Sequence, residues 1–350
     1  MIRVLIVDDS PTSREYLRHI IASDENLEVA GVAEDGREAV ELAEKKRPDV
    51  ITMDIQMPRM DGYEATRLIM DRCPVPIVVI SSSLIPEQVK NTFRAIRAGA
   101  VAALEKPRGP GHPESGRMVA KIIQTVKLMS EVRVIRRYSK RQKDEMGKVP
   151  HRLPKMADMR LPNIKLVAIG ASTGGPPVIR SILSRLDRTF PVPLLFVQHI
   201  SPGFLQGMTD WLGKETDVSV EIPRHGDLIL PGAAYFAPDG YHMGITRKGE
   251  IILSKKEPIK GLRPAVSYLF SSVGEAFGAE AMGILLTGMG KDGAPELKMM
   301  RDKGALTIAQ DKESSVVHGM PGEAIKLGAA KHIFSSEEIA SFLVRMKDKI

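Results

Sequence analysis

Hydrophobic residues in the first third of the chain fall into short runs separated by amphipathic stretches. Residues 11–22 and 36–46 carry apolar side chains every three to four positions, which is typical of helices that bury one face. The apolar runs have the length of buried strands and lie at residues 2–7, 29–33, 50–53, 76–81 and 100–104. This alternation predicts a doubly wound, flavodoxin-like α/β domain in which helices cover both faces of a parallel sheet.

A loop, a helix and a polar stretch follow this pattern. Residues 107–116 contain three Pro and three Gly and predict a loop, and a helix with one apolar stripe begins at residue 117. Residues 139–163 are basic, contain Pro and lack hydrophobic periodicity, as expected of a domain boundary. We therefore predict a first domain over residues 1–125, a linker over residues 126–163 and a second domain over residues 164–350.

The second half of the chain resumes the alternation but shares no motif with the first half. Strands are expected at residues 165–170, 193–198, 282–288 and 305–310, and helices at residues 176–186, 264–277, 293–303 and 321–328. Residues 218–254 have a more β-like pattern. These elements predict a second doubly wound α/β domain, a Rossmann-like three-layer arrangement, without an internal repeat.

The composition is that of a soluble globular protein with two domains. The chain has 350 residues, of which 43% are hydrophobic and 27% are charged. It contains no run of about 18 apolar residues that would span a membrane, and its first apolar run meets Asp8 at once, unlike a signal peptide. We therefore expect a cytoplasmic protein without membrane insertion. The single cysteine, Cys73, excludes an internal disulfide and a thiolate metal cluster, and we expect its thiol to be buried and inert.

The net charge of +7 is concentrated in the predicted linker. Residues 127–163 carry eleven Lys or Arg and four Asp or Glu, and the rest of the chain sums to zero. Neither predicted domain has the basic excess of a nucleic-acid-binding surface, so we expect no nucleic-acid partner. A solvated linker is the simplest interpretation of this charge, and a patch for an acidic partner is the alternative.

Polar side chains follow the predicted strands of the first domain at the points where the strands end. The carboxyl ends of parallel strands meet in one crevice, so these residues would share a pocket: Asp8, Asp9, Asp54, Ser81, Ser82 and Lys106. Clustered carboxylates repel one another and require a cation, and oxygen ligands suit Mg²⁺. The cation and Lys106 would shield an incoming phosphoryl group while Asp54 attacks it. A single pair of aspartates could be explained as surface acids. The whole set of polar residues at strand ends could not be explained in this way.

These residues resemble the receiver domains of bacterial response regulators over about residues 1–125. The matching segments are VDDS at 7–10, MDIQMPRMDG at 53–62, ISSS at 80–83 and EKP at 105–107. The resemblance implies that Asp54 is the phospho-acceptor. It also implies that Asp9, Asp54 and the backbone of Gln56 hold Mg²⁺, while Asp8 assists the metal through water.

The same resemblance assigns the remaining polar residues of the pocket. Ser81 would be the switch hydroxyl, and Lys106 would contact the phosphoryl group. One departure is Ala103, which stands three residues before the lysine, where receivers usually carry an aromatic switch residue. The route from Asp54 to the output surface would then depend less on rotation of an aromatic ring.

A glycine-rich turn opens the second domain between a predicted strand and a predicted helix. The segment GASTGG at 170–175 permits a tight turn, and the helix that follows offers free N–H groups at its N-terminus. A phosphate loop would use the same features, but neither GxGxxG nor GK[ST] spacing is present. Ser172 stands in this turn, where its hydroxyl would be presented above the sheet as in a nucleophile elbow.

A serine nucleophile requires a base, and the base requires an acid that orients it. The histidines of the second domain are His199, His225, His242, His318 and His332. Only His199 directly follows a clear buried strand, and Asp292 lies in the loop after the strand at 282–287. Ser172, His199 and Asp292 therefore all fall at strand carboxyl ends and can meet in one crevice. Their order in the chain favours convergence rather than a relation to α/β-hydrolases.

These pieces resemble the catalytic domain of the CheB family of chemotaxis protein-glutamate methylesterases. The matching segments cover residues 164–330 and are IGASTGG, QHISPGF at 198–204, LPGAAYFAPDGYHM at 230–243, LLTGMGKDGA at 285–294 and VVHGMPGEA at 316–324. The resemblance implies that Ser172 is the nucleophile, His199 the base and Asp292 the orienting acid. The backbone N–H of Met289 would contribute to the oxyanion hole, and Thr173 would support the site.

The resemblance also implies an activity and its control. The enzyme would hydrolyse glutamate methyl esters on chemoreceptors, with glutamine deamidation by the same chemistry, and the esterase site would need no metal or cofactor. A chemotaxis histidine kinase would be the phosphodonor. Because the linker is long, the receiver could pack over the hydrolase crevice and block it, and we predict that phosphorylation of Asp54 weakens this contact and raises the esterase activity. A departure appears where the family often has His and Asp and this chain has Leu262 and Ser267, although Arg263 and Pro264 remain.

Three alternatives stay open from the residues alone. The same triad could act on another ester or amide in a chemosensory pathway unrelated to swimming. The second domain could be a binding module that phosphorylation switches without catalysis. A DNA-binding response regulator is disfavoured, because the basic charge is confined to the linker and the second half is α/β.

Overall fold

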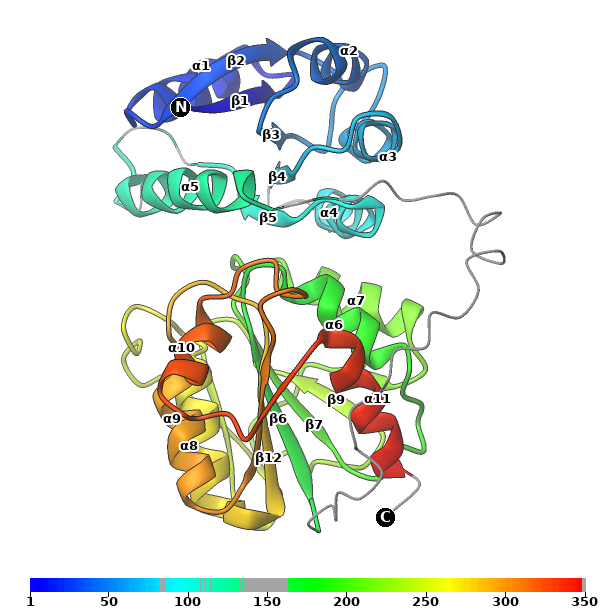
Figure 1. Cartoon of the computed structure of the whole chain (residues 1–350), viewed down its shortest axis with the longest axis vertical. Coiled ribbons are helices and arrows are strands. Elements are labelled where there is room, and N and C mark those ends of the chain that lie inside the picture. The colour runs from blue at the N-terminus through cyan, green and yellow to red at the C-terminus, as the bar shows by residue number, and fades with distance from the viewer. Residues whose placement is uncertain are drawn as a thin grey trace. The chain divides into compact units, whose positions relative to one another are not determined.

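The computed structural model describes residues 1–81, 86–107, 109, 111–113, 115–132, 134 and 163–347. The chain divides into two compact units, Met1–Arg160 and Leu161–Ile350 (Figure 1). Most of the predicted linker, residues 126–163, lies outside the described residues, so the domain limits stay a prediction. Among the described residues, no helix combines the length and the apolarity needed to cross a membrane.

The first unit alternates strands and helices along the whole of its described length. The elements are β1 (Ile2–Val7), α1 (Pro11–Ala22), β2 (Leu27–Ala33), α2 (Gly36–Lys46), β3 (Val50–Met53), α3 (Gly62–Arg72), β4 (Ile77–Ser81), α4 (Pro86–Ala98), β5 (Ala102–Glu105) and α5 (Ser115–Ser130). All strand pairs are parallel, in the order β2-β1-β3-β4-β5. Helices α1 and α5 pack together on one face of the sheet, and α2, α3 and α4 cover the other (Figure 1).

Short polar residues begin the helices of this unit. The side chain of Ser10 accepts the N–H of Ser13 at the start of α1, and Asp61 accepts the N–H of Glu64 at the start of α3. Gly62 opens α3, and a Cβ at this position would lie 1.9 Å from the carbonyl oxygen of Asp54. The absence of a side chain at Gly62 therefore lets α3 begin directly against the loop that carries Asp54.

The second unit is built around a larger parallel sheet. Its elements are β6 (Leu166–Ala171), α6 (Gly175–Leu183), β7 (Leu194–Gln198), α7 (Leu205–Glu215), β8 (Ser219–Glu221), β9 (Ala233–Phe236), β10 (His242–Ile245), β11 (Ile251–Ser254), α8 (Val266–Phe277), β12 (Ala281–Leu285), α9 (Ala294–Asp302), β13 (Leu306–Gln310), α10 (Met320–Lys326), β14 (His332–Phe334) and α11 (Ser336–Lys347). The seven-stranded sheet has the order β14-β13-β12-β6-β7-β9-β8, and β10 and β11 form a separate antiparallel pair.

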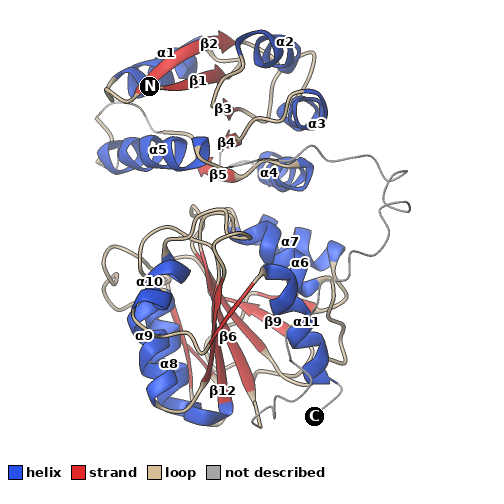
Figure 2. Cartoon of the chain, in the orientation of Figure 1, coloured by secondary structure: helices blue, strands red, loops and turns tan. Residues whose placement is uncertain are grey.

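Two layers of helices enclose this sheet. Helices α8, α9 and α10 lie on one face, and α6, α7 and α11 lie on the other (Figure 2). Strand β6 is buried along its whole length, as expected for a strand covered on both sides. A Cβ at Gly170 would lie 2.3 Å from the side chain of Val266, so this glycine lets the start of α8 approach the end of β6.

The predicted fold class, two doubly wound α/β domains, is confirmed. The main differences lie at element ends and in elements that no sequence pattern indicated. The strand expected at 282–288 ends at Leu285, because the following residues turn into the loop above the sheet. Cys73 was expected to be buried but is half-buried, since it terminates α3 at the surface. The elements that the hydrophobic pattern did not reveal are α7, β14 and α11.

Candidate active site and candidate metal centre

The carboxyl ends of β6, β7 and β12 bring Ser172 and His199 together. Ala171 pairs with Gln198 across the two parallel strands, so the next residue of each strand is Ser172 or His199. The backbone N–H of His199 donates to the carbonyl of Ala171 at 2.9 Å, and that of Ser172 donates to the carbonyl of Thr287 at 3.0 Å. Ser172 and His199 therefore leave neighbouring strands at the same edge of the sheet.

Glycines make the turn that presents Ser172. Gly174 has φ +77°, a conformation that favours glycine, and a Cβ at Gly175 would lie 2.0 Å from Oε1 of Gln198. The Gln198 side-chain amide donates to the carbonyl oxygens of both Ser172 and His199, each at 2.8 Å. One buried glutamine thus ties the backbone of the predicted nucleophile to that of the predicted base.

The imidazole of His199 lies against the carboxylate of Asp292. Nε2 of His199 is 3.0 Å from Oδ2 of Asp292, and the two side chains are only 13% and 8% exposed. The separation is within hydrogen-bond range, but the N–H direction does not meet the geometry of a hydrogen bond, so the contact is a close ion pair when the imidazole is protonated. Because Nε2 faces the acid, Nδ1 is the ring nitrogen that remains for a serine proton.

Asp292 is itself held by the first turn of α8. Its Oδ2 accepts the backbone N–H of Val266 at 2.6 Å, and its Oδ1 accepts that of Ser267 at 3.1 Å. Burial alone would raise the pKa of Asp292, but the contacts with His199, Ser267 and Val266 together hold this pKa below its usual value. The carboxylate therefore stays ionised and is suited to stabilise a protonated imidazole.

The loop after β12 offers a free backbone donor beside the turn. The carbonyl of Gly288 accepts the N–H groups of Gly319 and Met320, at 3.1 and 2.8 Å, which fixes the loop. A Cβ at Gly288 would lie 2.7 Å from Cβ of Ser172, so the two segments are in close contact. Within the described part of the chain, the backbone N–H groups of Met289 and Thr173 have no acceptor, as expected of donors that would bind an oxyanion.

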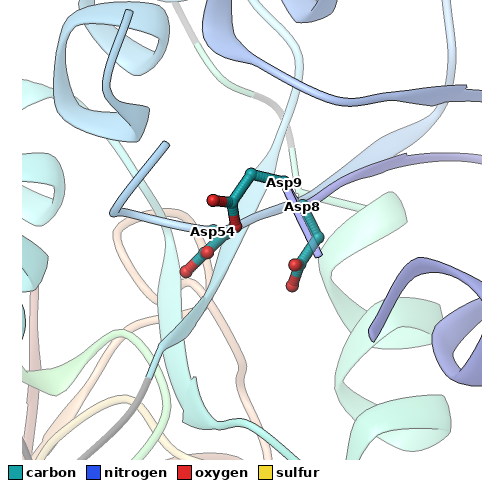
Figure 3. A group of neighbouring side chains, drawn as sticks. All are labelled: Asp8, Asp9 and Asp54. Atoms are coloured by element: carbon teal, nitrogen blue, oxygen red, sulfur yellow. The ribbon is translucent and has the colours of Figure 1, made fainter. Parts of the chain in front are cut away.

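The acidic residues predicted for the first unit also come together. One carboxylate oxygen from each of Asp8, Asp9 and Asp54 lies within 4.8 Å of the others (Figure 3). Asp8 and Asp54 are buried and Asp9 is exposed, so the cluster opens to solvent on one side. The Nζ atom of Lys106 lies 2.8 Å from Oδ2 of Asp54 and 2.9 Å from Oδ2 of Asp8.

The charge balance in this cluster depends on burial. Burial raises the pKa of Asp54 to about 6, and the neighbouring charge of Asp8 adds to this rise, while Lys106 opposes it. Three carboxylates against one ammonium leave an excess of negative charge, and hard oxygen ligands are what Mg²⁺ requires. The residues present therefore fit a divalent cation.

The other residues predicted for this pocket lie around it. Ser81 is buried at the last position of β4, and its carbonyl accepts the N–H of Lys106 at 2.9 Å. Gln56 is exposed in the loop after Asp54, and Ser82 lies outside the described residues. Ala103 pairs with Val79 within the sheet.

Comparison with known proteins covers both units. A family model described as CheB methylesterase matches residues 167–343, and a response regulator receiver domain model matches residues 4–112. The protein-glutamate methylesterase/protein-glutamine glutaminase 4 of Geobacter metallireducens is 53% identical over 347 residues, which are 99% of this chain and 99% of that protein. The corresponding protein of Nitrosospira multiformis is 49% identical over 346 residues, 99% of this chain and 97% of that protein.

The chain belongs to the CheB methylesterase family. Its second unit is also similar to the crystal structure of the Thermotoga maritima CheB methylesterase catalytic domain. The TM-score is 0.51 with 34% identity, over 52% of this chain and 98% of that one. The receiver resemblance of the first unit and the CheB resemblance of the second are thus both confirmed.

Of the two positions at which this chain departs from the usual CheB pattern, Ser267 contacts Asp292. Ser267 donates its backbone N–H to Asp292, and its buried side chain also contributes to lowering the pKa of that carboxyl. Leu262 exchanges two backbone hydrogen bonds of 3.0 Å with Ile259 and so closes a tight turn. The family's usual side chains at these positions are absent, but the backbone contact that holds Asp292 does not depend on them.

Some residues of the site were not predicted. Val266 and Ser267 hold Asp292 through their backbone, and Gln198 joins Ser172 to His199 through its side-chain amide. Backbone donors leave no trace in residue type, so no sequence pattern could have indicated the first two. The polar Gln198 at the end of an otherwise apolar strand was a signal that could have been used.

Proposed function

We propose that this member of the CheB family hydrolyses glutamate γ-methyl esters on chemoreceptors and releases methanol. The observation that carries the proposal is the 3.0 Å approach of His199 to Asp292 at the sheet edge where the Ser172 turn also lies. The names of relatives that align over the full chain support the same activity, including glutamine deamidation.

The reaction follows from the roles proposed for these side chains. The Ser172 hydroxyl attacks the γ-carbonyl carbon while Nδ1 of His199 takes its proton, and Asp292 stabilises the resulting imidazolium. The backbone N–H groups of Met289 and Thr173 bind the oxyanion, and each such donor is typically worth about 10²–10³ in rate. Methanol leaves with the proton from His199, and water activated by His199 then releases a glutamate carboxylate. Deamidation would follow the same steps with ammonia as the leaving group.

The receiver would control this activity. Asp54 accepts a phosphoryl group from a chemotaxis histidine kinase, while Lys106 contacts that group and Ser81 serves as the switch hydroxyl. Asp9, Asp54 and the Gln56 backbone would hold Mg²⁺, with Asp8 assisting through water. A Mg²⁺ ion held by these residues would neutralise charge on the carboxylates and on the phosphoryl oxygens.

The proposed control depends on the domain organisation of the chain. The receiver would span residues 1–125, the linker residues 126–163 and the catalytic domain residues 164–350. We expect the phosphorylated receiver to raise methylesterase activity above that of the unphosphorylated full chain. Higher activity in the unphosphorylated full chain would contradict this control.

The test is methanol release from a purified methylated receptor, with and without a small phosphodonor. Wild type should release methanol, and more of it with the phosphodonor. Ser172→Ala should release none above background, whereas Ser184→Ala, at the end of α6 and outside the site, should behave as wild type. Wild type that turns over another ester, but not the receptor, would identify a different substrate for the same triad. Full activity in Ser172→Ala would reject the site.

A further inference from the structure

A cationic loop borders the active site at the start of α8. We call residues 255–263 the basic arm; its charged residues are Lys255, Lys256, Glu257, Lys260 and Arg263. All four of its cations are exposed. Residues 164–350 contain 22 Lys or Arg and 20 Asp or Glu, a net charge of +2, whereas the arm alone has a net charge of +3. The positive charge of the catalytic unit is therefore concentrated in this loop.

The basic arm is held in a defined shape at both ends. Nη1 of Arg263 donates to the carbonyl oxygens of Lys255 and Lys256, at 3.1 and 3.2 Å, and so ties the end of the arm to its beginning. Between them, Nε2 of His242 lies 3.1 Å from the carbonyl of Glu257. His242 is buried and stacks on Tyr268 of α8, so this contact connects the arm to the folded core.

A two-residue turn forms the tip of the arm. Ile259 and Leu262 exchange two backbone hydrogen bonds of 3.0 Å, and the residues between them, Lys260 and Gly261, have φ of +51° and +80°. Such a turn is the tight hairpin type, which fixes the direction in which its side chains project. Lys260 is therefore presented at the tip of a closed turn.

The basic arm adjoins the catalytic residues through two elements. Arg263 lies three residues before Val266, whose backbone N–H binds Asp292. The charge of Lys260 acts on Glu296 in the first turn of α9, four residues beyond Asp292. The basic arm therefore lies next to the part of the site that orients the base.

The lysines of the arm form no close salt bridge within the described residues, and the acidic group on which Lys260 acts is Glu296. Within the described residues, no carboxylate oxygen lies within 4.0 Å of Nζ of Lys255, Lys256 or Lys260. Lys255 lies over the ring of Tyr241 at 5.2 Å, which leaves its ammonium exposed. These three cations are exposed, lie next to a hydrolytic site and make no close salt bridge within the described residues, so they are available to an anionic ligand.

We propose that the basic arm is a docking surface for an acidic stretch of the polypeptide substrate, next to the scissile side chain. This inference rests on the proposed function. A methyl ester or an amide is neutral, so these cations cannot recognise the reacting group itself. Each turnover, however, creates a carboxylate, and a substrate with several modified glutamates becomes more acidic as the reaction proceeds. Cations beside the site would hold such a segment and steer its encounter with the enzyme.

The test compares two variants of the full chain with equal loss of charge. In the arm variant, Lys255, Lys256 and Lys260 are each changed to Gln, which keeps the length of the side chain. In the control variant, Lys214, Lys303 and Lys331 are changed to Gln. These three exposed lysines lie at the opposite end of the sheet, near the end of α7, after α9 and before β14. The measurements are kcat and KM for methanol release from a methylated receptor, and the Kd of the unmethylated receptor, at low and high ionic strength.

The arm variant should raise KM and Kd by about tenfold and leave kcat within about twofold, because exposed ion pairs add binding without contacting the reacting atoms. Its KM should also depend less on salt than that of wild type. The control variant should match wild type. An unchanged KM in the arm variant, or an equal rise in the control, would overturn the proposal. If wild type releases no methanol, the proposed function fails, and the Kd comparison alone decides whether the arm binds acidic polypeptide.

Discussion

Substituting Asp292 by Asn separates the charge of this residue from its shape. Oδ2 of Asp292 lies 3.0 Å from Nε2 of His199 and 2.6 Å from the backbone nitrogen of Val266, and Oδ1 lies 3.1 Å from that of Ser267. Both oxygens therefore face N–H donors. An asparagine must turn its own NH₂ group toward one of these sets, so either orientation opposes a donor to a donor.

The expected losses follow from these contacts. A buried N–H group left without an acceptor costs about 1–3 kcal/mol, and removal of a negative charge from a helix N-terminus costs about 0.3–1 kcal/mol. Asp292→Asn should therefore lower the free energy of unfolding of the second unit by about 1–4 kcal/mol. It should also lower kcat by about 10²–10⁴, because the imidazolium formed in the reaction loses the charge that stabilises it.

The chain provides its own reporter for this measurement. Trp211 is the single tryptophan and is only 9% exposed in α7, so its fluorescence follows unfolding of the second unit in urea. Asp227→Asn is a matched control, because Asp227 uses one oxygen only, toward the N–H of Arg224 at 2.7 Å. The control should leave the unfolding free energy and kcat within error. Wild-type stability and turnover in Asp292→Asn would refute the dual role assigned to this carboxylate.

Three further results are expected. Ser172→Ala should lower kcat by about 10⁴–10⁶ while the unfolding curve stays that of wild type, since the half-buried hydroxyl makes no hydrogen bond among the described residues. A fall in the free energy of unfolding as large as the loss of transition-state stabilisation would point to a structural role. Gly175→Ala should lower the free energy of unfolding by about 1–3 kcal/mol and should also lower turnover, because its Cβ would meet Oε1 of Gln198 at 2.0 Å. Gly213→Ala is the control and should change neither quantity, because its Cβ would meet no atom within 4 Å. The pKa of Asp54 is about 6 in the folded protein, against 3.8 for an ordinary aspartate, so the folded protein binds the proton more tightly than the unfolded chain does. The free energy of unfolding therefore falls as the pH rises between these values. In the absence of divalent cations, Asp54→Asn should therefore stabilise the first unit by up to about 3 kcal/mol at pH 7.5 and should not stabilise it below pH 4. Amide hydrogen exchange in β1 and β3 measures this stability. Equal effects at both pH values would contradict the raised pKa of Asp54.

Much of the fold was predictable, because the sequence signals for individual helices and strands agree with the elements that the folded chain contains. The helix at 11–22 was predicted at its observed limits, since Ser10 and Pro11 start it and apolar residues continue it. Of the three elements that were missed, β14 and α11 lie near the end of the chain, and α7 lies earlier in the second unit. Strand β14 has three residues, too few for a period of two to be recognised.

The candidate site was predictable as a location but not as a set of contacts. The rule that parallel strands end at one edge correctly indicated that His199 and Asp292 would meet. The attachment of Asp292 to α8 was not foreseeable, because it depends on how closely that helix approaches the sheet. That approach requires Gly170 at the end of β6, where a side chain would collide with Val266. Packing of this kind involves residues about a hundred positions apart, which no local pattern records.

Partitioning of the acyl-enzyme by hydroxylamine tests the central claim most directly. If Ser172 forms an ester with the receptor glutamate, hydroxylamine must compete with water for it. The account predicts that wild type converts part of the methylated glutamates to hydroxamates while methanol release continues, and that Ser172→Ala forms no more hydroxamate than a reaction without enzyme. Enzymatic methanol release without any hydroxamate, or the same hydroxamate yield from Ser172→Ala, would contradict a covalent mechanism at Ser172.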